Sequence, residues 1–458
     1  MNIIELALVD FFKESPDKTL IIAYSGGVDS QVLLVALAKL KQQGYLSNAI
    51  KVCHVNHGLS SHADEWQTFA QQQCDHFSLP LISHQLNLKK QVQQSLEAIA
   101  RDARYKCLVQ TSTEPAIIVT GHHLNDQGET FLLALKRGAG LKGLAAMSAS
   151  VPLAQHTLTR PLLSISRADI VDYANQQKLN WIEDESNQDQ NFDRNFLRHT
   201  VLPALETRWP SINKTIARSA KHCFEAQQLL DELAQEDLID CQSSPHKLSI
   251  SHLNKLRESR LKNLLRYFLS THHLLMPSQQ QLKQICQQLN ADADKSPVIQ
   301  LANCCLRRFK SELYLTNIYQ DISLWEKTVD TGYLSDNEVV NVHLPDALGT
   351  LNFSTKSVQE QNKNAWQADI KKPMANQSVT VQFSHENPKC LPQYRQHSRP
   401  VKKVLQELAI PPWQRKRLPF IFYDNELIAV VGHFVCKAYV ADNDDDRFII
   451  SWDGEPSF

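Results

Sequence analysis

A short glycine-rich segment near the N-terminus is the strongest candidate for chemistry in this chain. It reads Ser25-Gly26-Gly27-Val28-Asp29-Ser30 and lies between a β-rich run and a helical pattern. Two glycines let backbone N–H groups approach a ligand closely, the serines add hydroxyl donors, and a helix N-terminus adds partial positive charge. The segment therefore predicts a phosphate site. Asp29 would repel phosphate by itself, so we expect it to hold a Mg²⁺ ion that bridges to the phosphate groups.

An ordinary strand-to-helix turn, with Asp29 or Ser30 near the helix cap, is the simpler explanation of this segment. A pattern with this many fixed residue types seldom arises by chance in a strand–turn–helix context. The Gly-Lys-Ser/Thr ending of a Walker A loop is absent from the segment. We therefore interpret it as a nucleotide-binding loop of another kind.

Further polar side chains follow the other predicted strands or lie in basic segments near them. His54 and His57 end the second predicted strand, and His122 follows the fourth, just before a helical pattern. Ligands of a parallel α/β sheet bind beyond the carboxyl ends of its strands. The candidate residues from these segments are His54, Arg101, His122, Asp126, Glu129, Arg137, Lys142, Arg194 and Arg198.

Several of these residues have simpler explanations. His54 and His57 have the residue types of a metal pair, but no third ligand is near them in the sequence. Asp126 and Glu129 have the spacing of a capping box, so the start of a helix could by itself explain both residues. The basic residues among glycines over 135–144 are compatible with a solvated turn, although a basic loop beside a nucleotide site suits RNA phosphates better.

The nucleotide-binding loop resembles that of the pyrophosphatase-loop (PP-loop) ATPases, which release pyrophosphate and form an adenylated intermediate. With the segments that follow it, the chain resembles the tRNA(Ile)-lysidine synthase family, in the bacterial long form with two C-terminal domains. The resemblance is dense over residues 19–205 and resumes over 404–431. The segments that carry it are HVNHGL (54–59), EAIAR (97–101), GHHLNDQGET (121–130), LKRGAGLKGL (135–144), RPLL (160–163), WIEDESN (181–187), RNFLRH (194–199) and VLQELAIPPWQR (404–415).

This resemblance implies an ATP-dependent ligase. ATP adenylates the wobble cytidine of an isoleucine tRNA with a CAU anticodon, and pyrophosphate leaves. The ε-amine of free L-lysine then attacks C2 of that base and expels AMP, which gives lysidine and changes codon recognition from AUG to AUA. The implied cofactors and partners are ATP, Mg²⁺, L-lysine and the tRNA, and whether the protein forms a homodimer stays open.

The resemblance also implies roles for the candidate residues. Asp126, with His122 one helical turn earlier if the helix extends that far, would act as general base or orient the amine. Arg101 would neutralise the α-phosphate together with Mg²⁺ on Asp29, and Glu129 would bind the lysine substrate. How Asp126, His122 and Glu129 divide the roles of base, amine orientation and lysine binding stays open. His54 joins Ser25, Gly26, Gly27, Val28, Asp29 and Ser30 in ATP binding, and the tRNA contacts are Arg137, Lys142, Arg194, Arg198 and Arg415.

Alternating strands and helices along the first two hundred residues would position these side chains. The expected strands are 19–24, 50–55, 81–86 and 116–120, and the expected helices are 29–43, 62–77, 95–111 and 126–136. This alternation is typical of an α/β fold of Rossmann-like type, in which helices cover both faces of a doubly wound parallel sheet.

Four regions are expected along the chain. Residues 1–210 form the PP-loop catalytic domain, 211–320 a mainly helical tRNA-binding domain that ends in a hairpin over 297–316, 321–377 a polar linker region, and 378–458 a small α+β domain for tRNA recognition. The last region has a helix over 400–408 and strands over 420–423 and 427–431. Basic residues near an aromatic ring suit contacts with RNA, which marks Arg307-Arg308, Lys402-Lys403 and Arg415-Lys416-Arg417 beside Trp413.

The composition excludes several other classes of protein. Of 458 residues 42% are hydrophobic and 21% charged, with a net charge of −1, so any attraction to nucleic acid must come from local patches. No apolar run approaches the roughly 20 residues of a membrane span, and the N-terminus lacks signal-peptide features, so we expect a cytoplasmic protein. The ten cysteines include no Cys-x-x-Cys pair, which counts against zinc, iron–sulfur clusters and a tRNA thiolase. An amide-forming synthetase would not explain segment 121–130, and an RNA chaperone without catalysis would not need Arg101 with that segment.

Overall fold

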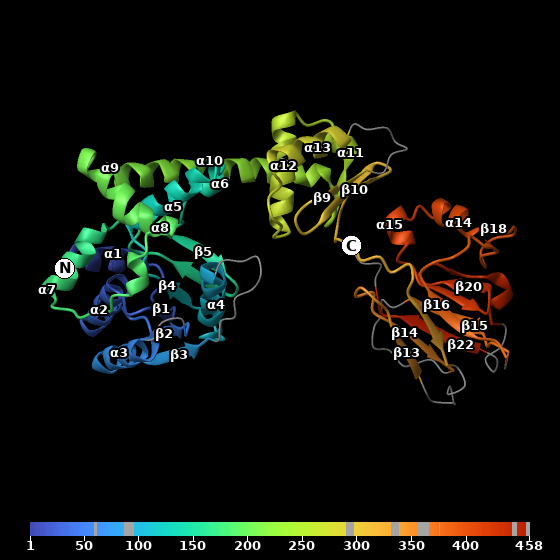
Figure 1. Cartoon of the computed structure of the whole chain (residues 1–458), viewed down its shortest axis with the longest axis horizontal. Coiled ribbons are helices and arrows are strands. Elements are labelled where there is room, and N and C mark those ends of the chain that lie inside the picture. The colour runs from blue at the N-terminus through green and yellow to red at the C-terminus, as the bar shows by residue number, and fades with distance from the viewer. Residues whose placement is uncertain are drawn as a thin grey trace. The chain divides into compact units, whose positions relative to one another are not determined.

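The computed structural model of the chain, shown in Figure 1, describes residues 1–58, 62–86, 96–289, 297–330, 339–355, 366–374, 376–441 and 447–454. The chain forms two compact units, Met1–Leu230 and Asp231–Phe458. Within the described ranges, none of the helices combines the length and the apolar character that a membrane crossing requires.

A six-stranded sheet forms the centre of the first unit, in the order β3-β2-β1-β4-β6-β5. All neighbouring strands are parallel except β5, which pairs antiparallel with β6 at one edge. The predicted doubly wound sheet is confirmed, and the two short strands β5 and β6 were not predicted. The strands are β1 (Leu20–Tyr24), β2 (Ile50–Asn56), β3 (Leu81–Gln85), β4 (Ile117–Val119), β5 (Ser150–Leu153) and β6 (His156–Thr159).

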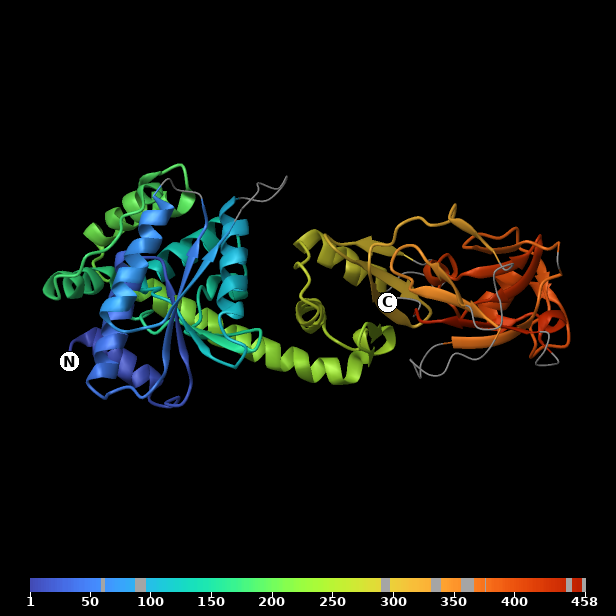
Figure 2. The same cartoon turned by 90° about the horizontal axis from the view of Figure 1, so that it is seen from below.

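Helices cover both faces of this sheet, as the two views show (Figures 1 and 2). Side chains of β1 alternate between the faces: Leu20 and Ile22 pack in the larger core, and Ile21 packs with Leu108 in the smaller one. This alternation follows from the period of two residues in a strand. The larger core includes side chains of α1 (Ile3–Phe12), α2 (Val28–Gln42), α3 (Ala63–His76) and α7 (Arg167–Gln176), and the smaller includes α4 (Leu96–Gln110).

The order of the strands reverses between β1 and β4, which are direct neighbours. After β1 the chain enters α2, and after β4 it enters α5 (Leu124–Lys136). Ligands of open α/β sheets bind in the crevice beyond the carboxyl ends of strands at such a reversal. The fold therefore brings segments 25–30 and 121–126 to the same edge of the sheet, which we call the β1–β4 crevice.

Short helices complete the first unit and lead into the second. They are α6 (Leu141–Leu144), η1 (Glu185–Gln188), α8 (Asp193–Phe196), the π-helical turn η2 (Leu197–Val201) and α9 (Leu202–Arg208). The long helix α10 (Ile212–Cys241) begins in the first unit and ends in the second.

The part of the second unit that follows α10 contains a sheet that the sequence analysis missed. The predicted hairpin is confirmed as β10 (Cys305–Phe309) and β11 (Glu312–Thr316), but it belongs to a five-stranded sheet in the order β7-β8-β11-β10-β9. The expectation of a mainly helical region was therefore incomplete, because strands of three residues are too short to show an alternating pattern. The other elements are β7 (Gln242–Ser244), β8 (Lys247–Ser249), α11 (Ile250–Leu253), α12 (Glu258–Thr271), α13 (Gln279–Leu289) and β9 (Val298–Gln300).

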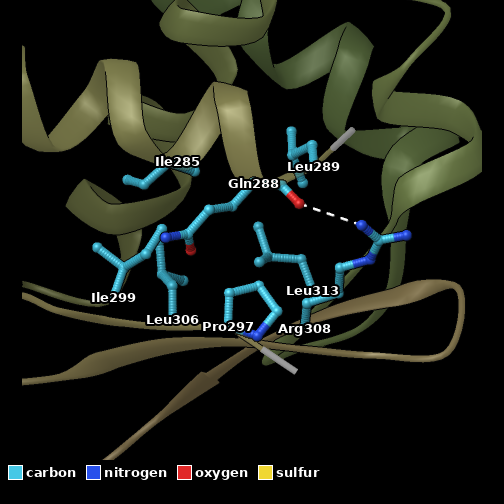
Figure 3. A pocket seen from close by; sticks show the side chains of 8 residues that line it. All are labelled: Ile285, Gln288, Leu289, Pro297, Ile299, Leu306, Arg308 and Leu313. Atoms are coloured by element: carbon cyan, nitrogen blue, oxygen red, sulfur yellow. Dashed lines mark hydrogen bonds between the residues drawn. The ribbon is translucent and has the colours of Figure 1, made fainter. Parts of the chain in front are cut away.

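A cavity of about 10 Å³ lies between α13 and this sheet (Figure 3). Ile285 and Leu289 of α13 line it from one side, and Leu306 and Leu313 line it from the hairpin. Arg308 at its edge donates from Nη1 to the Gln288 carbonyl at 3.1 Å (Figure 3). A space of this size holds about one water molecule, so it is a packing gap and not a substrate site.

The expectation of a linker over 321–377 is wrong. This region supplies the strands β12 (Glu326–Val329), β13 (Val339–His343), β14 (Thr350–Ser354) and β15 (Trp366–Lys371). Their apolar side chains, including Val342, Phe353 and Ile370, are buried in a core that they share with Ile421 and Ile450. The polar residues between and within these short strands hide the pattern in the sequence.

Two sheets built from these strands and later ones form the C-terminal domain. Their orders are β12-β16-β19-β20-β21 and β13-β14-β22-β15. The helix expected over 400–408 and both strands expected over 420–431 are confirmed as α14, β19 and β20. The elements are β16 (Val379–Gln382), β17 (Lys389–Cys390), β18 (Arg399–Pro400), α14 (Val401–Glu407), α15 (Pro412–Arg415), β19 (Phe420–Tyr423), β20 (Glu426–Val430), β21 (Phe434–Val435), η3 (Lys437–Tyr439) and β22 (Arg447–Trp452).

Candidate functional site

The glycine-rich loop connects β1 to α2 and is closed by the hydroxyl of Ser30. The Ser30 Oγ accepts hydrogen bonds from the backbone N–H groups of Ser25 (3.2 Å) and Gly26 (3.1 Å) and donates to the Gly27 carbonyl (2.9 Å). Two loop N–H groups thus converge on a single oxygen atom. Ser30 occupies these two donors, but the N-terminus of α2 has no side-chain cap, and an uncapped helix start is an arrangement that binds phosphate oxygens.

Gly26 fits this loop because no other residue could occupy its position without strain. Its φ is +87°, and a Cβ atom added there would lie 2.5 Å from Ile182 Cδ1. The Ile182 N–H also donates to the Gly26 carbonyl at 2.9 Å. Segment 181–187, which the sequence analysis selected separately, therefore lies directly against the loop.

Asp29 lies in the first turn of α2, where its side chain is about one third exposed. Its Oδ1 atom is buried and has no hydrogen-bond partner. Burial raises the pKa of Asp29, and the nearby carboxylate of Asp126 raises it further, whereas His123 opposes both effects. A buried carboxylate oxygen without a partner, close to a second carboxylate, is an arrangement that a divalent cation would stabilise.

Gly121 brings the end of β4 against this first turn. A Cβ atom added at Gly121 would lie 2.9 Å from the Asp29 carbonyl oxygen, so a larger residue would push the two segments apart. The residues after Gly121 consequently reach the β1–β4 crevice.

His123 caps α5 and is the main functional candidate that the sequence analysis missed. Its Nδ1 accepts from the Asp126 backbone N–H at 3.4 Å, and the Asp126 carboxylate accepts from the His123 backbone N–H at 3.0 Å. The capping box is therefore formed by His123 and Asp126, and the alternative pairing of Asp126 with Glu129 is wrong. A histidine is not among the preferred capping residues, so the spacing alone did not indicate it.

The same imidazole lies between two carboxylates. His123 Nε2 is 3.6 Å from Asp29 Oδ1 and 3.5 Å from Asp126 Oδ2, and the ring is almost fully buried. Because Nδ1 accepts a hydrogen bond, a neutral His123 carries its proton on Nε2, which faces both carboxylates. His123 thereby connects the nucleotide-binding loop to the start of α5.

His122 precedes the cap and lies outside α5, so the condition that the helix extends to His122 is not met. Its Nδ1 lies 2.8 Å from Thr120 Oγ1. Burial lowers the pKa of His122 to about 4; Asp126 opposes this shift, and Arg160 and Arg101 add to it. His122 is therefore a neutral imidazole at physiological pH, able to accept a proton. Arg101 itself is exposed on α4, with its guanidinium 5.6 Å from the Tyr105 ring centre.

Asp126 and Glu129 form a network with two arginines from α8 and η2. Arg194 donates from Nε to Glu129 at 2.6 Å and from Nη2 to Asp126 at 3.0 Å. Arg198 donates from Nε to Glu129 at 2.6 Å and from Nη2 to Asp126 at 3.3 Å. Burial opposes ionisation of Asp126, but His123 and the arginine charge outweigh it, so the pKa of Asp126 is lowered. The structure thus gathers two carboxylates and two guanidinium groups beside the loop, in what we call the four-charge network.

The remaining candidates lie apart from this network. His54 is buried at the end of β2, with Nδ1 3.1 Å from the Tyr24 carbonyl, and burial lowers its pKa. Arg137 and Lys142 are exposed around α6. Arg415 lies in the second unit, half-buried, and donates from Nε to the Ile410 carbonyl at 2.7 Å. Among the described residues, no group of three or more His, Cys, Asp and Glu side chains could hold a metal ion.

Three family models match this chain in succession. A PP-loop domain matches residues 2–205, a TilS substrate binding domain matches 248–314, and a TilS substrate C-terminal domain matches 379–452. The first contains the whole β1–β4 crevice, and the other two fall in the second unit.

Relatives named tRNA(Ile)-lysidine synthase extend the similarity over most of the chain. The protein of Serratia proteamaculans is 41% identical over 420 residues, which is 92% of this chain and 92% of the relative. That of Haemophilus influenzae strain PittEE is 40% identical over 421 residues, 90% of this chain and 94% of the relative. That of Coxiella burnetii is 39% identical over 425 residues, 93% of this chain and 91% of the relative. The chain therefore belongs to the tRNA(Ile)-lysidine synthase family.

Proposed function

We propose that this protein uses ATP to join free L-lysine to C2 of the wobble cytidine in an isoleucine tRNA with a CAU anticodon. The cytidine C2 oxygen attacks the α-phosphorus of ATP, and pyrophosphate leaves. The ε-amine of lysine then attacks C2, the C2–oxygen bond breaks, and AMP leaves with the two electrons of that bond. The amine loses one proton for each lysidine formed.

The observation that carries this proposal is the four-charge network beside the nucleotide-binding loop. Free lysine at neutral pH has two ammonium groups and one carboxylate. Asp126 and Glu129 offer carboxylates for the ammonium groups, and Arg194 and Arg198 offer planar donors for the carboxylate. Because the arginines and carboxylates already bond to each other, lysine would exchange these ion pairs for pairs of its own.

The loop residues from Ser25 to Ser30 and His54 are assigned to ATP. The N-terminus of α2 has no side-chain cap, so its first-turn N–H groups and the helix dipole suit the phosphates. Asp29 would hold Mg²⁺, since its buried Oδ1 has no hydrogen-bond partner and magnesium binds through one or two carboxylates plus phosphate oxygens. The ion supplies positive charge that offsets the charge of the phosphates. Arg101 is exposed on α4, and its guanidinium would neutralise the α-phosphate.

Proton removal from the attacking amine falls to Asp126 or His122. Asp126 is ionised, because its pKa is lowered, and it lies in the network that would hold the amine. His122 is neutral with a pKa of about 4 and therefore stays unprotonated at physiological pH. Because Asp126 is ionised and His122 is neutral, either side chain can accept the proton without first losing one of its own.

The tRNA contacts are assigned to basic residues of both units. Arg137 and Lys142 flank the glycines around α6 in the first unit, and Arg415 belongs to the second. The isoleucine tRNA is distinguished from others through the two regions that match substrate-binding models. A base in the anticodon loop is already unpaired, so the cost of turning it into the crevice is small.

The test is lysine-dependent AMP release by the full chain. An unmodified isoleucine tRNA transcript with a CAU anticodon should release one AMP for each labelled lysine incorporated. A transcript with uridine at the wobble position, and a methionine tRNA with the same anticodon, should give neither product. AMP release that does not depend on lysine, or that depends on a sulfur donor instead of lysine, would refute the proposal.

A further inference from the structure

An aromatic and basic cluster in the second unit joins two parts of the chain that have separate cores. One core consists of residues from Cys241 to Leu315, and the others consist of residues from Ile322 onward. Among the described residues, none belongs both to the first of these cores and to a later one. The cluster, which we call the clasp, consists of Arg307, Phe309, Tyr314, Tyr319, Trp413 and Arg417.

Trp413 of α15 is only 8% exposed and packs against the β10–β11 hairpin. Its ring lies 6.0 Å from the ring of Phe309 at 82° and 5.2 Å from that of Tyr314 at 72°. Edge-to-face geometry of this kind is the favourable arrangement for aromatic pairs. The Arg307 guanidinium of the same hairpin lies 5.5 Å from the Trp413 ring centre.

Tyr319, in the segment between the two parts, is held by arginines from both. The Arg307 guanidinium is 5.5 Å from its ring centre, and the Arg417 guanidinium is 4.2 Å from it. Arg417 is buried, forms an ion pair with Asp346, and donates from Nη2 to the Asp346 carbonyl at 3.1 Å. Burial raises the pKa of Tyr319, in keeping with a phenol enclosed by these side chains.

These contacts change the interpretation of the basic cluster beside Trp413. A side chain that RNA contacts must be accessible, but Trp413 and Arg417 are buried against the protein. Arg307 donates to Thr316 Oγ1 at 2.9 Å and lies against two rings, so its guanidinium is also engaged within the protein. The residue types that suit RNA binding serve here to attach one part of the second unit to the other.

We propose that the clasp fixes the C-terminal domain to the preceding part, so that the two present their tRNA contacts as one preassembled surface. This inference rests on the proposed tRNA-binding function. If the two parts moved independently, tRNA binding would have to order them, and that ordering would reduce affinity. The clasp residues are positioning residues, which act on tRNA affinity and not on the chemistry in the first unit.

The experiment compares Trp413→Ala with wild type in the full chain. We expect the Kd for isoleucine tRNA to rise about tenfold, because a desolvated cation–π contact and two aromatic pairs are lost. At saturating tRNA, kcat should stay within about twofold of wild type, since the crevice is untouched. Trp413→Phe keeps a ring against Phe309 and Tyr314 and should restore most of the affinity. The matched control is Gln414→Ala, beside Trp413 on α15, which removes no clasp contact and should bind like wild type.

A second readout is independent of tRNA and of activity. Chymotrypsin cleaves after Tyr319, which is half-buried in the clasp, and after Leu324, which is 97% exposed and serves as the internal reference. Trp413→Ala should speed cleavage after Tyr319 relative to Leu324. Unchanged cleavage, or an unchanged Kd in a variant that is cleaved faster, would overturn the proposal. So would a loss of affinity in Lys416→Ala equal to that in Trp413→Ala, because it would indicate direct RNA contact. If wild type itself fails to bind the tRNA, the proposed function is refuted. The ratio of cleavage after Tyr319 to cleavage after Leu324 then still tests whether the clasp holds the two parts together.

Discussion

The β1–β4 crevice and the clasp both hold charged side chains in buried surroundings, but they leave those charges in different states. In the crevice, the side chains of Asp29, Arg194 and Arg198 remain 35%, 28% and 22% exposed. In the clasp, Arg417 is covered by a ring and paired with a carboxylate. Charges that are buried but still accessible on one side can exchange partners with a ligand, whereas enclosed pairs hold the protein together.

The backbone shows the same contrast. The crevice depends on Gly26 and Gly121, where any side chain would meet Ile182 or the Asp29 carbonyl. The clasp depends on bulky rings. A site that must bring backbone N–H groups to phosphate needs small residues, and an attachment between two parts needs contact area.

Gly26→Ala should have the largest effect on the crevice. The added methyl would lie 2.5 Å from Ile182 Cδ1 at a φ of +87°, so the Ile182 side chain or the strained loop must shift. We expect adenylation of tRNA to fall about a thousandfold, as when positioned donors are lost from an active site. The measurement is ATP-dependent pyrophosphate release with saturating tRNA.

Gly44→Ala is the matched control for that substitution. Gly44 also has a positive φ, +76°, but an added Cβ would meet nothing within 4 Å. It should cost about 1 kcal/mol of stability from the backbone alone and leave pyrophosphate release intact. Equal losses of activity in both variants would show that strain, and not the position of the loop, is responsible.

Asp126→Asn tests the division of roles within the crevice and should have the next largest effect. It removes the charge that would accept the lysine proton but leaves the loop in place. Lysine transfer should slow about a hundredfold while the adenylated tRNA accumulates, which quenched single-turnover assays with labelled ATP can follow. Equal loss of both half-reactions would contradict this role.

The residues of the crevice were largely predictable from the sequence, for a physical reason. In a parallel sheet the residues after each strand meet at one edge, so Ser25 to Ser30 and His122 to Glu129 had to lie near each other. The partners of Glu129 were not predictable. Arg194 and Arg198 reach it through a π-helical turn about seventy residues later, and the family resemblance had assigned both arginines to tRNA.

The second unit was harder to predict, because its strands are short and its basic clusters follow no strand ends. Short strands with polar turns over 321–377 looked like a linker, and only the buried side chains of Val342 and Phe353 show that they form a core. Trp413 among basic residues matched a pattern that RNA-binding surfaces and internal cation–π contacts share. Composition cannot separate these two uses, since burial decides between them.

His123→Asn should sharpen the picture of the crevice with a smaller effect. Asparagine is a preferred N-cap residue, so α5 keeps its cap, but its shorter side chain cannot lie between Asp29 and Asp126 as the imidazole does. We expect the KM for ATP to rise about tenfold, because one opposing charge or dipole near the carboxylates is lost. His123→Ala removes the cap as well and should in addition cost about 1 kcal/mol of stability. If His123→Asn behaves like wild type, the bridge between the carboxylates has no function.

The low pKa of His122 predicts a pH dependence of stability. The pKa is about 4 in the folded protein, against 6.5 for an unperturbed histidine. Between these values the unfolded chain binds a proton that the folded protein does not, so His122 lowers the free energy of unfolding as the pH falls from 6.5 to 4. Urea denaturation across this range should show a steeper loss in wild type than in His122→Gln, which cannot take up the proton. Equal slopes would show that the ring is solvated.

Arg137→Ala gives the smallest expected effect and returns to the contrast between accessible and engaged charges. Arg137 is exposed, and its guanidinium donates from Nε to the Leu133 carbonyl at 3.2 Å. Its loss should weaken tRNA binding a few-fold and reduce the slope of log Kd against log salt by about 0.7 to 0.9, the value of one phosphate contact. Arg417→Gln removes a buried positive charge together with the planar group against Tyr319. It should weaken binding without changing that slope, because the charge that is lost contacts no phosphate. If both variants reduce the slope of log Kd against log salt equally, Arg417 contacts RNA phosphate as Arg137 does. The distinction between accessible charges and charges engaged within the protein would then not hold for tRNA binding.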